Sequence, residues 1–141
     1  MGRLQFRHFF EMAVRWGDLD ALGHVNNVQL MRYLESGRVA YCEDVLAITF
    51  GKQLKAGWIL ADLQATFSNQ LHYPARVEVA TRITSMGNSS ANIDAAIFPK
   101  DSKKDLLTSK GIFVWFDYEK QKSARIPEKV RHAIMEYEKT V

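Results

Sequence analysis

Cysteine is nearly absent from this chain, in which Cys42 is the one cysteine among 141 residues. A single cysteine excludes an internal disulfide, so we expect a protein of a reducing compartment. Apolar runs of membrane-spanning length are also lacking, and Glu11 interrupts the apolar residues near the N-terminus, which is not typical of a signal peptide. These absences predict a soluble, cytoplasmic protein without a membrane partner.

The motifs of several enzyme classes are lacking as well. The 4 histidines are far apart in the sequence, and no zinc signature is present. The chain has no glycine-rich phosphate loop and no Gly-x-Ser-x-Gly elbow, and Cys42 has no evident basic partner. We therefore expect no metal and no bound cofactor, and a chemistry that rests on carboxylates, amides and backbone dipoles.

Charge is modest and scattered, since 19 lysines and arginines against 16 aspartates and glutamates give a net charge of +3. Nucleic-acid binding would favour a coherent basic stripe, so we do not expect this partner. An anionic small ligand is weakly indicated, and an ordinary solvated surface explains the charge better. With 47% hydrophobic residues and no internal repeat, the chain is expected to form one domain over residues 1–141.

The spacing of apolar residues changes along the chain. Alternation predicts strands at about 9–16, 58–67, 76–85, 90–98 and 106–117, with a loop around 49–58 and turns at 72–75, 85–89 and 99–105. Helical spacing predicts a long helix from about residue 27 and a short C-terminal helix with Pro127 at its first position. Gly37 in the long helix indicates close approach of another backbone. The predicted class is α+β, with the long helix on the concave face of an antiparallel sheet.

One polar stretch, GDLDALGHVNN at residues 17–27, joins the first strand to the long helix. Asp18 and Asp20 come just before the helix N-terminus, where unpaired amides and the positive helix dipole stabilise a developing oxyanion. A carboxylate beside such an end can act as general base or nucleophile. Gly23 permits a tight turn or the approach of a ligand. Capping by Asn26 or Asn27 explains the same residues without any catalysis, so this stretch alone leaves the two interpretations open.

The run RWGDLDALGHVNNVQLMRYLESGR at residues 15–38 closely resembles the signature of a known family. It is similar to the hotdog-fold acyl-CoA thioesterases of the 4-hydroxybenzoyl-CoA thioesterase type, written Asp-x-Asp-x-x-Gly-His-Val-Asn-Asn. This resemblance implies a hotdog fold, in which a five-stranded antiparallel sheet wraps around one long helix. It also implies a homodimer or homotetramer, with sheets joined edge to edge and active sites between subunits.

The resemblance assigns roles position by position. Asp20 falls at the catalytic carboxylate, which attacks the thioester carbonyl or activates water, and the backbone N–H of Asn27 would polarise that carbonyl. Gly23 would give space to the substrate. The remaining expected substrate contacts are His24, Val25 and Asn26, together with Asp62 and Gln64, which would face the acyl pocket from the partner subunit. Asp18 is expected to order the loop, and His24 is expected to shape it more than to transfer protons.

One departure concerns the coenzyme A phosphates, which relatives often bind with basic residues in the hairpin between the third and fourth strands. That hairpin reads SMGNSSAN here and has no lysine or arginine. Neutral contacts from Asn88, Ser89 and Ser90, or lysines on the next loop such as Lys103, are the alternatives, and an acyl carrier protein is another possible thiol carrier.

The expected reaction is hydrolysis of an acyl-CoA or aroyl-CoA thioester to a carboxylic acid and coenzyme A. The alternatives are an acyl-ACP thioesterase and a non-catalytic acyl-thioester-binding protein. A hotdog enoyl-thioester hydratase is disfavoured. Such enzymes usually carry an Asp and a His five apart in an Asp-x-Asn-Pro-x-His run, whereas Asp20 and His24 are four apart with no proline between them.

Overall fold

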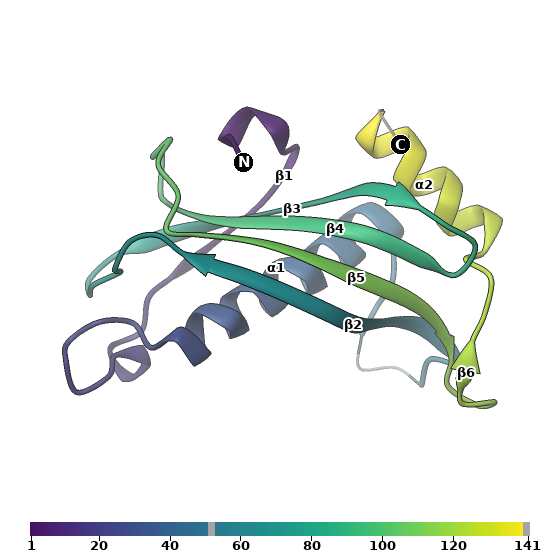
Figure 1. Ribbon diagram of the computed structural model, residues 1–141, viewed down its shortest axis with the longest axis horizontal. Helices are drawn as coiled ribbons and strands as arrows, with labels where there is room; N and C mark the ends of the chain where they lie inside the picture. The colour runs from purple at the N-terminus through teal and green to yellow at the C-terminus, as the bar shows by residue number, and fades with distance from the viewer. Residues whose placement is uncertain (51–52, 140–141) are drawn as a thin grey trace.

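Five long antiparallel strands curl around one long helix (Figure 1). The computed structural model describes residues 1–50 and 53–139. Its helices and strands follow in the order η1 Arg3–Gln5, β1 His8–Ala13, η2 Trp16–Asp18, α1 Asn27–Leu46, β2 Ala56–Phe67, β3 Arg76–Met86, β4 Ser90–Pro99, β5 Leu107–Asp117, β6 Lys122–Ser123 and α2 Glu128–Glu138. The predicted α+β class and the hotdog arrangement are confirmed.

The strands lie in the order β1-β3-β4-β5-β2, and the two-residue strand β6 pairs with β5. The hairpins β3–β4 and β4–β5 are where the sequence predicted them. The predicted turn at 72–75 belongs instead to a link that leaves β2 at one edge of the sheet and returns to β3 near the other. This link carries a cis peptide bond between Tyr73 and Pro74.

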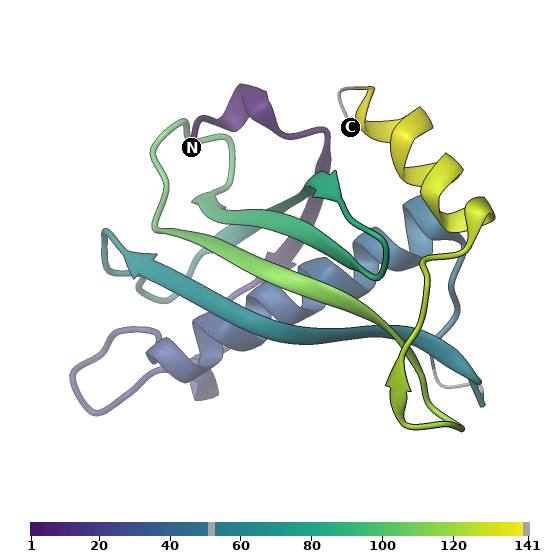
Figure 2. The ribbon, with the colours of Figure 1, turned by 45° about the vertical axis from the view of Figure 1, so that its right-hand side comes forward.

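Helix α1 lies against the concave face of the sheet, as Figures 1 and 2 show. Leu30, Leu34 and Tyr41 are at most 3% exposed, because they face buried residues of the sheet. A Cβ atom at Gly37 would overlap the Val79 side chain of β3. A close approach at Gly37 is therefore confirmed, but the neighbouring atoms belong to the side chains of Val79 and Thr81 and not, as predicted, to a backbone.

Several local predictions need correction. Pro127 is the N-cap of α2, one residue before the predicted position, and β2 begins at Ala56. The short elements η1, η2 and β6 are absent from the apolar pattern because each spans only two or three residues. Of the predicted loop at 49–58, residues 51 and 52 lie outside the described residues.

The N-terminal segment covers part of the sheet's other face, where Phe6 packs with Phe98 and two alanines of β3 and β4. Within residues 1–50 and 53–139, no helix has the length and apolar character needed to cross a membrane.

Candidate active site

The loop between β1 and α1 is ordered by Asp18. Its Oδ2 atom accepts a hydrogen bond from the Tyr33 hydroxyl at 2.5 Å and from the Arg15 amide at 3.2 Å, and its carbonyl accepts from the Asn26 amide at 3.1 Å. Burial opposes ionisation of Asp18, which is 5% exposed, but the bonds from Tyr33 and Arg15 hold its pKa below the usual value. These contacts fit Asp18 as a residue that fixes the loop.

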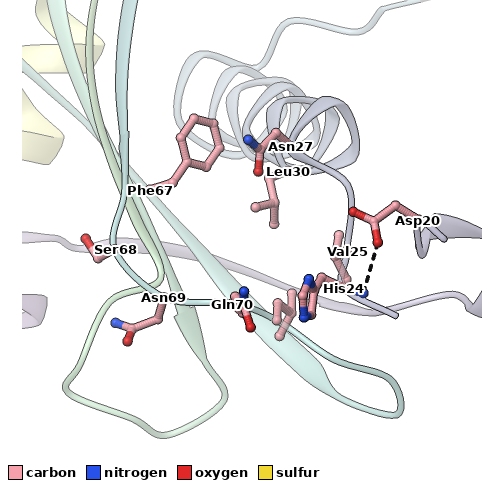
Figure 3. A pocket seen from close by; sticks show the side chains of 10 residues that line it. Asp20, His24, Val25, Asn27, Leu30, Phe67, Ser68, Asn69 and Gln70 are labelled. Atoms are coloured by element: carbon pink, nitrogen blue, oxygen red, sulfur yellow. Dashed lines mark hydrogen bonds between the residues drawn. The ribbon is translucent and has the colours of Figure 1, made fainter. Parts of the chain in front are cut away.

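Asp20 organises a tight turn two residues further on. Its Oδ1 atom accepts from the amides of Leu22 at 2.9 Å and His24 at 3.2 Å, and its own amide donates to the His24 carbonyl at 2.8 Å. Gly23 adopts a φ of 84°, a left-handed conformation that disfavours other residues. In Figure 3, one carboxylate oxygen of Asp20 makes the dashed bond to His24, and the other faces the space in front of Asn27.

Helix α1 begins at this turn. Asn26 is its N-cap, with a side-chain oxygen that accepts from the Val28 amide at 2.8 Å. The next two amides, of Gln29 and Leu30, donate to the Asn26 carbonyl. The Asn27 amide has no acceptor among the described residues. The first turn of α1 therefore keeps one unpaired donor at the positive end of the helix dipole.

A pocket of about 230 Å³ lies at this helix end. Four predicted residues line it together, namely Asp20, His24, Val25 and Asn27. Gly23 and Asn26 shape the loop beside it and are not in its lining. The imidazole of His24 contacts that of His72 edge to face, with ring centroids 5.0 Å apart.

The rest of the pocket comes from residues that were not among the predicted site residues. These are Leu30 of α1, Phe67 at the end of β2, and the link residues Ser68, Asn69, Gln70 and Leu71. The Val25 amide donates to the Leu71 carbonyl at 2.8 Å, which holds the link against the loop. The polar run Ser68 to Gln70 directly after a strand was the available signal.

Asp62 and Gln64 do not line this pocket within one subunit, and their contact from a partner subunit stays a prediction. A bulge between Leu60 and Asp62 shifts the pairing of β2 with β5, so that Asp62 lies opposite Ile112 and Gln64 opposite Lys110. Simple alternation from Trp58 would place both side chains on the helix side of the sheet, but one extra residue reverses the faces. Both side chains therefore lie on the face turned away from α1.

The candidate phosphate contacts divide between the two ends of the molecule. Asn88, Ser89 and Ser90 lie at the β3–β4 hairpin, far from the start of α1 (Figures 1 and 2). Arg125 donates to the Asn88 side chain at 3.0 Å, which ties this hairpin to the segment before α2.

Lys103 lies on the β4–β5 loop, which adjoins the pocket. The amides of Ser68 and Asn69 both donate to the carbonyl of Leu106 at the end of that loop. Within one subunit, the loop that carries Lys103 thus contacts the link that lines the pocket, whereas Lys103 itself is not among the lining residues.

Cys42 is unsuited to nucleophilic catalysis for a different reason from the one predicted. Arg38 lies near it and lowers the pKa of the thiol, but burial outweighs this effect and raises the pKa to about 12. The thiol therefore stays neutral near physiological pH. In the part of the chain that the structure describes, no cluster of three or more histidine, cysteine or acidic side chains is arranged to hold a metal ion.

Comparison with known proteins identifies the family of the chain. The family model of the thioesterase-like superfamily matches residues 14–134. The chain belongs to this superfamily. Membership supports thioester hydrolysis as the general activity.

Two curated relatives are chloroplastic acyl-acyl carrier protein thioesterases of Arabidopsis thaliana. ATL3 is 32% identical to this chain, and the match covers 92% of this chain and 68% of ATL3. ATL2 is 31% identical, and the match covers 88% of this chain and 66% of ATL2. The chain thus spans about two thirds of the length of these relatives.

Solved structures show the same fold. The PA2801 protein of Pseudomonas aeruginosa is 29% identical, with a TM-score of 0.83 over 90% of this chain and 97% of that chain. A Thermus thermophilus thioesterase complexed with coenzyme A and Zn is 24% identical, with a TM-score of 0.82 over 96% of this chain and 97% of that chain. At this identity the second match shows the fold alone.

Proposed function

We propose that this thioesterase-superfamily protein hydrolyses an acyl-CoA or aroyl-CoA thioester to the carboxylic acid and coenzyme A. The observation that carries the proposal is the meeting of the Asp20 carboxylate and the unpaired Asn27 amide at one pocket. Hydrolysis needs one base or nucleophile, one oxyanion donor and a water molecule. The pocket at the start of α1 offers the first two.

The two groups have complementary roles in this proposal. Asp20 is held by the Leu22 and His24 amides through one oxygen, which leaves the other for the reaction. That oxygen attacks the thioester carbonyl, or it removes a proton from an attacking water. The oxyanion that forms accepts a hydrogen bond from the Asn27 amide and is stabilised by the dipole of α1. Loss of one such donor typically costs roughly 100-fold to 1,000-fold in rate.

An acyl carrier protein is the alternative thiol carrier, because the two Arabidopsis relatives are named as acyl-acyl carrier protein thioesterases. Lys103, on the loop beside the pocket, is the favoured phosphate contact for either carrier. Comparison of kcat/KM for one acyl group carried by coenzyme A, by acyl carrier protein and by pantetheine separates these possibilities. A Lys103→Gln variant should lose activity on acyl-CoA and not on acyl-pantetheine.

The protein is also proposed to act as a homodimer or homotetramer. β2 is the last strand in the sheet order and has β5 as its one neighbour within the described residues. Such an edge strand can pair with a second copy. Analytical ultracentrifugation of the full chain tests this assembly.

Thiol release from short, long and aromatic acyl-CoAs tests the proposed reaction. Asp20→Asn keeps the side-chain size and removes the charge, so kcat should fall at least about 100-fold. Glu119→Gln, an exposed position in the loop between β5 and β6, is the matched control and should retain full activity. Turnover by Asp20→Asn at the wild-type rate would remove Asp20 from the mechanism.

A further inference from the structure

A second pocket, of about 180 Å³, lies between α1 and the sheet under β2 and β5. The described residues that line it are all different from those of the Asp20 pocket. Its apolar walls include Val39, Leu60 and Phe113, and the charged residues Glu35 and Arg38 also line it. We call it the Trp58 pocket, after one of the aromatic side chains that line it, and we call the pocket at the start of α1 the Asp20 pocket.

Trp58, one of the lining residues, carries a buried polar atom. Its indole stacks on Phe113, with ring centroids 5.2 Å apart, and meets Trp115 edge to face at 5.1 Å. Trp58 is 9% exposed, and its Nε1–H group has no acceptor in the described part of the chain. Buried donors are nearly always paired, so an unpaired one indicates an acceptor that comes from outside the chain.

Arg38 contributes a charge to the same pocket. Its guanidinium makes no hydrogen bond or ion pair of standard length with any described residue, although the Glu35 carboxylate is near enough to raise its pKa. Burial outweighs this influence and lowers the pKa of Arg38 below its usual value. The guanidinium still carries its charge at neutral pH, since its usual pKa is so high. A half-buried cation in an apolar site favours an anionic partner.

We propose that the Trp58 pocket binds a short apolar carboxylic acid. The apolar part of the acid packs against Leu60, Val39 and Phe113, and the carboxylate accepts hydrogen bonds from Arg38 and from the Trp58 indole. An apolar cavity of about 150 Å³ accommodates benzene, so a pocket of about 180 Å³ suits a six-carbon chain or a single ring.

The acid belongs to the same chemical class as the product of thioester hydrolysis. A role of the pocket in retaining product or in inhibition by product therefore rests on the proposed function. Binding of the acid itself does not depend on turnover. The test accordingly uses the Asp20→Asn protein, in which binding can be followed whether or not the wild type hydrolyses any thioester.

Titration of this ¹⁵N-labelled protein with hexanoate tests the proposal by NMR. The chain has 3 tryptophans, and loss of one indole N–H signal in Trp58→Phe assigns the signal of Trp58. Hexanoate should shift the Trp58 signal, while the signal of Trp16, which does not line the pocket, stays in place. Hexan-1-ol has the same chain without the carboxylate and should bind at least about tenfold more weakly.

Arg38→Gln should also weaken hexanoate binding at least about tenfold. The matched control is Arg32→Gln, at an exposed position of α1 that does not line the pocket, and it should bind like its parent. Equal binding of hexanoate and hexan-1-ol would overturn the proposal, as would unchanged affinity in Arg38→Gln. Hexanoate that shifts His24 and leaves the Trp58 signal unmoved would also overturn it, because the acid would then occupy the Asp20 pocket.

Discussion

Replacing Asn27 with proline tests the proposed oxyanion donor by removing a single backbone N–H. Asn27 is the first residue of α1, where proline is favoured because its amide has no partner within the helix. The residue before a proline must be extended, and Asn26 already has φ −63° and ψ 141°. The substitution therefore fits the backbone and breaks no hydrogen bond within the described residues.

The expected loss follows from the value of one oxyanion-hole donor, which is about 2.7–4 kcal/mol in the transition state. We expect kcat for thioester hydrolysis by Asn27→Pro to fall roughly 100-fold to 1,000-fold, with the free energy of unfolding changed by less than about 1 kcal/mol. Thiol release under saturating substrate measures the first quantity, and urea unfolding measures the second.

Asn27→Ala is the matched control, because it removes the side chain that lines the pocket and keeps the N–H. Its kcat should fall much less than that of Asn27→Pro. Equal kcat values for the two variants would refute the assignment of the amide as oxyanion donor. A fall in both variants together would instead assign the role to the Asn27 side chain.

Two further predictions concern stability. Gly37→Ala should lower the free energy of unfolding by roughly 1–2 kcal/mol, because overlap with Val79 outweighs the better helix propensity of alanine; stabilisation in urea unfolding would contradict this packing. Tyr33→Phe should destabilise the protein by about 1–3 kcal/mol near neutral pH, because Asp18 loses its 2.5 Å hydrogen bond. The native pKa of Asp18 lies below its ordinary value of 3.8, so this contribution is present above 3.8 and is lost as the pH falls through the native pKa. The difference between Tyr33→Phe and wild type in urea unfolding should therefore shrink towards acid pH, and a constant difference would exclude the charge of Asp18 as its cause.

Local patterns in the sequence predicted much of the fold. The stripe of Leu30, Leu34 and Tyr41 is buried because helical spacing alone decides which face of α1 is apolar. Asn26 was one of the two residues proposed to cap this helix, and a short polar side chain at that point needs only its nearest neighbours to form a cap.

Features that depend on pairing between distant segments were not predictable in the same way. The bulge beside Asp62 is visible only in the register of β2 against β5, and it decides the face on which Asp62 and Gln64 lie. The link wall of the Asp20 pocket depends on the bond from Val25 to Leu71, whose positions are distant in the sequence. The alternation of apolar residues carries no information about the bulge in β2 or about the contact between Val25 and Leu71.

The two aspartates of the loop illustrate how tertiary contacts separate residues that look equivalent in sequence. Asp18 and Asp20 are two positions apart, and both precede the start of α1. The Asp18 carboxylate turns inward and accepts hydrogen bonds from Tyr33 and Arg15, which hold the loop in place. The Asp20 carboxylate uses one oxygen to hold the turn up to His24, and its other oxygen faces the pocket. The buried Asp18 thus fixes the backbone of the loop that leads to Asp20 and to the start of α1, through its contacts with Arg15, Tyr33 and Asn26.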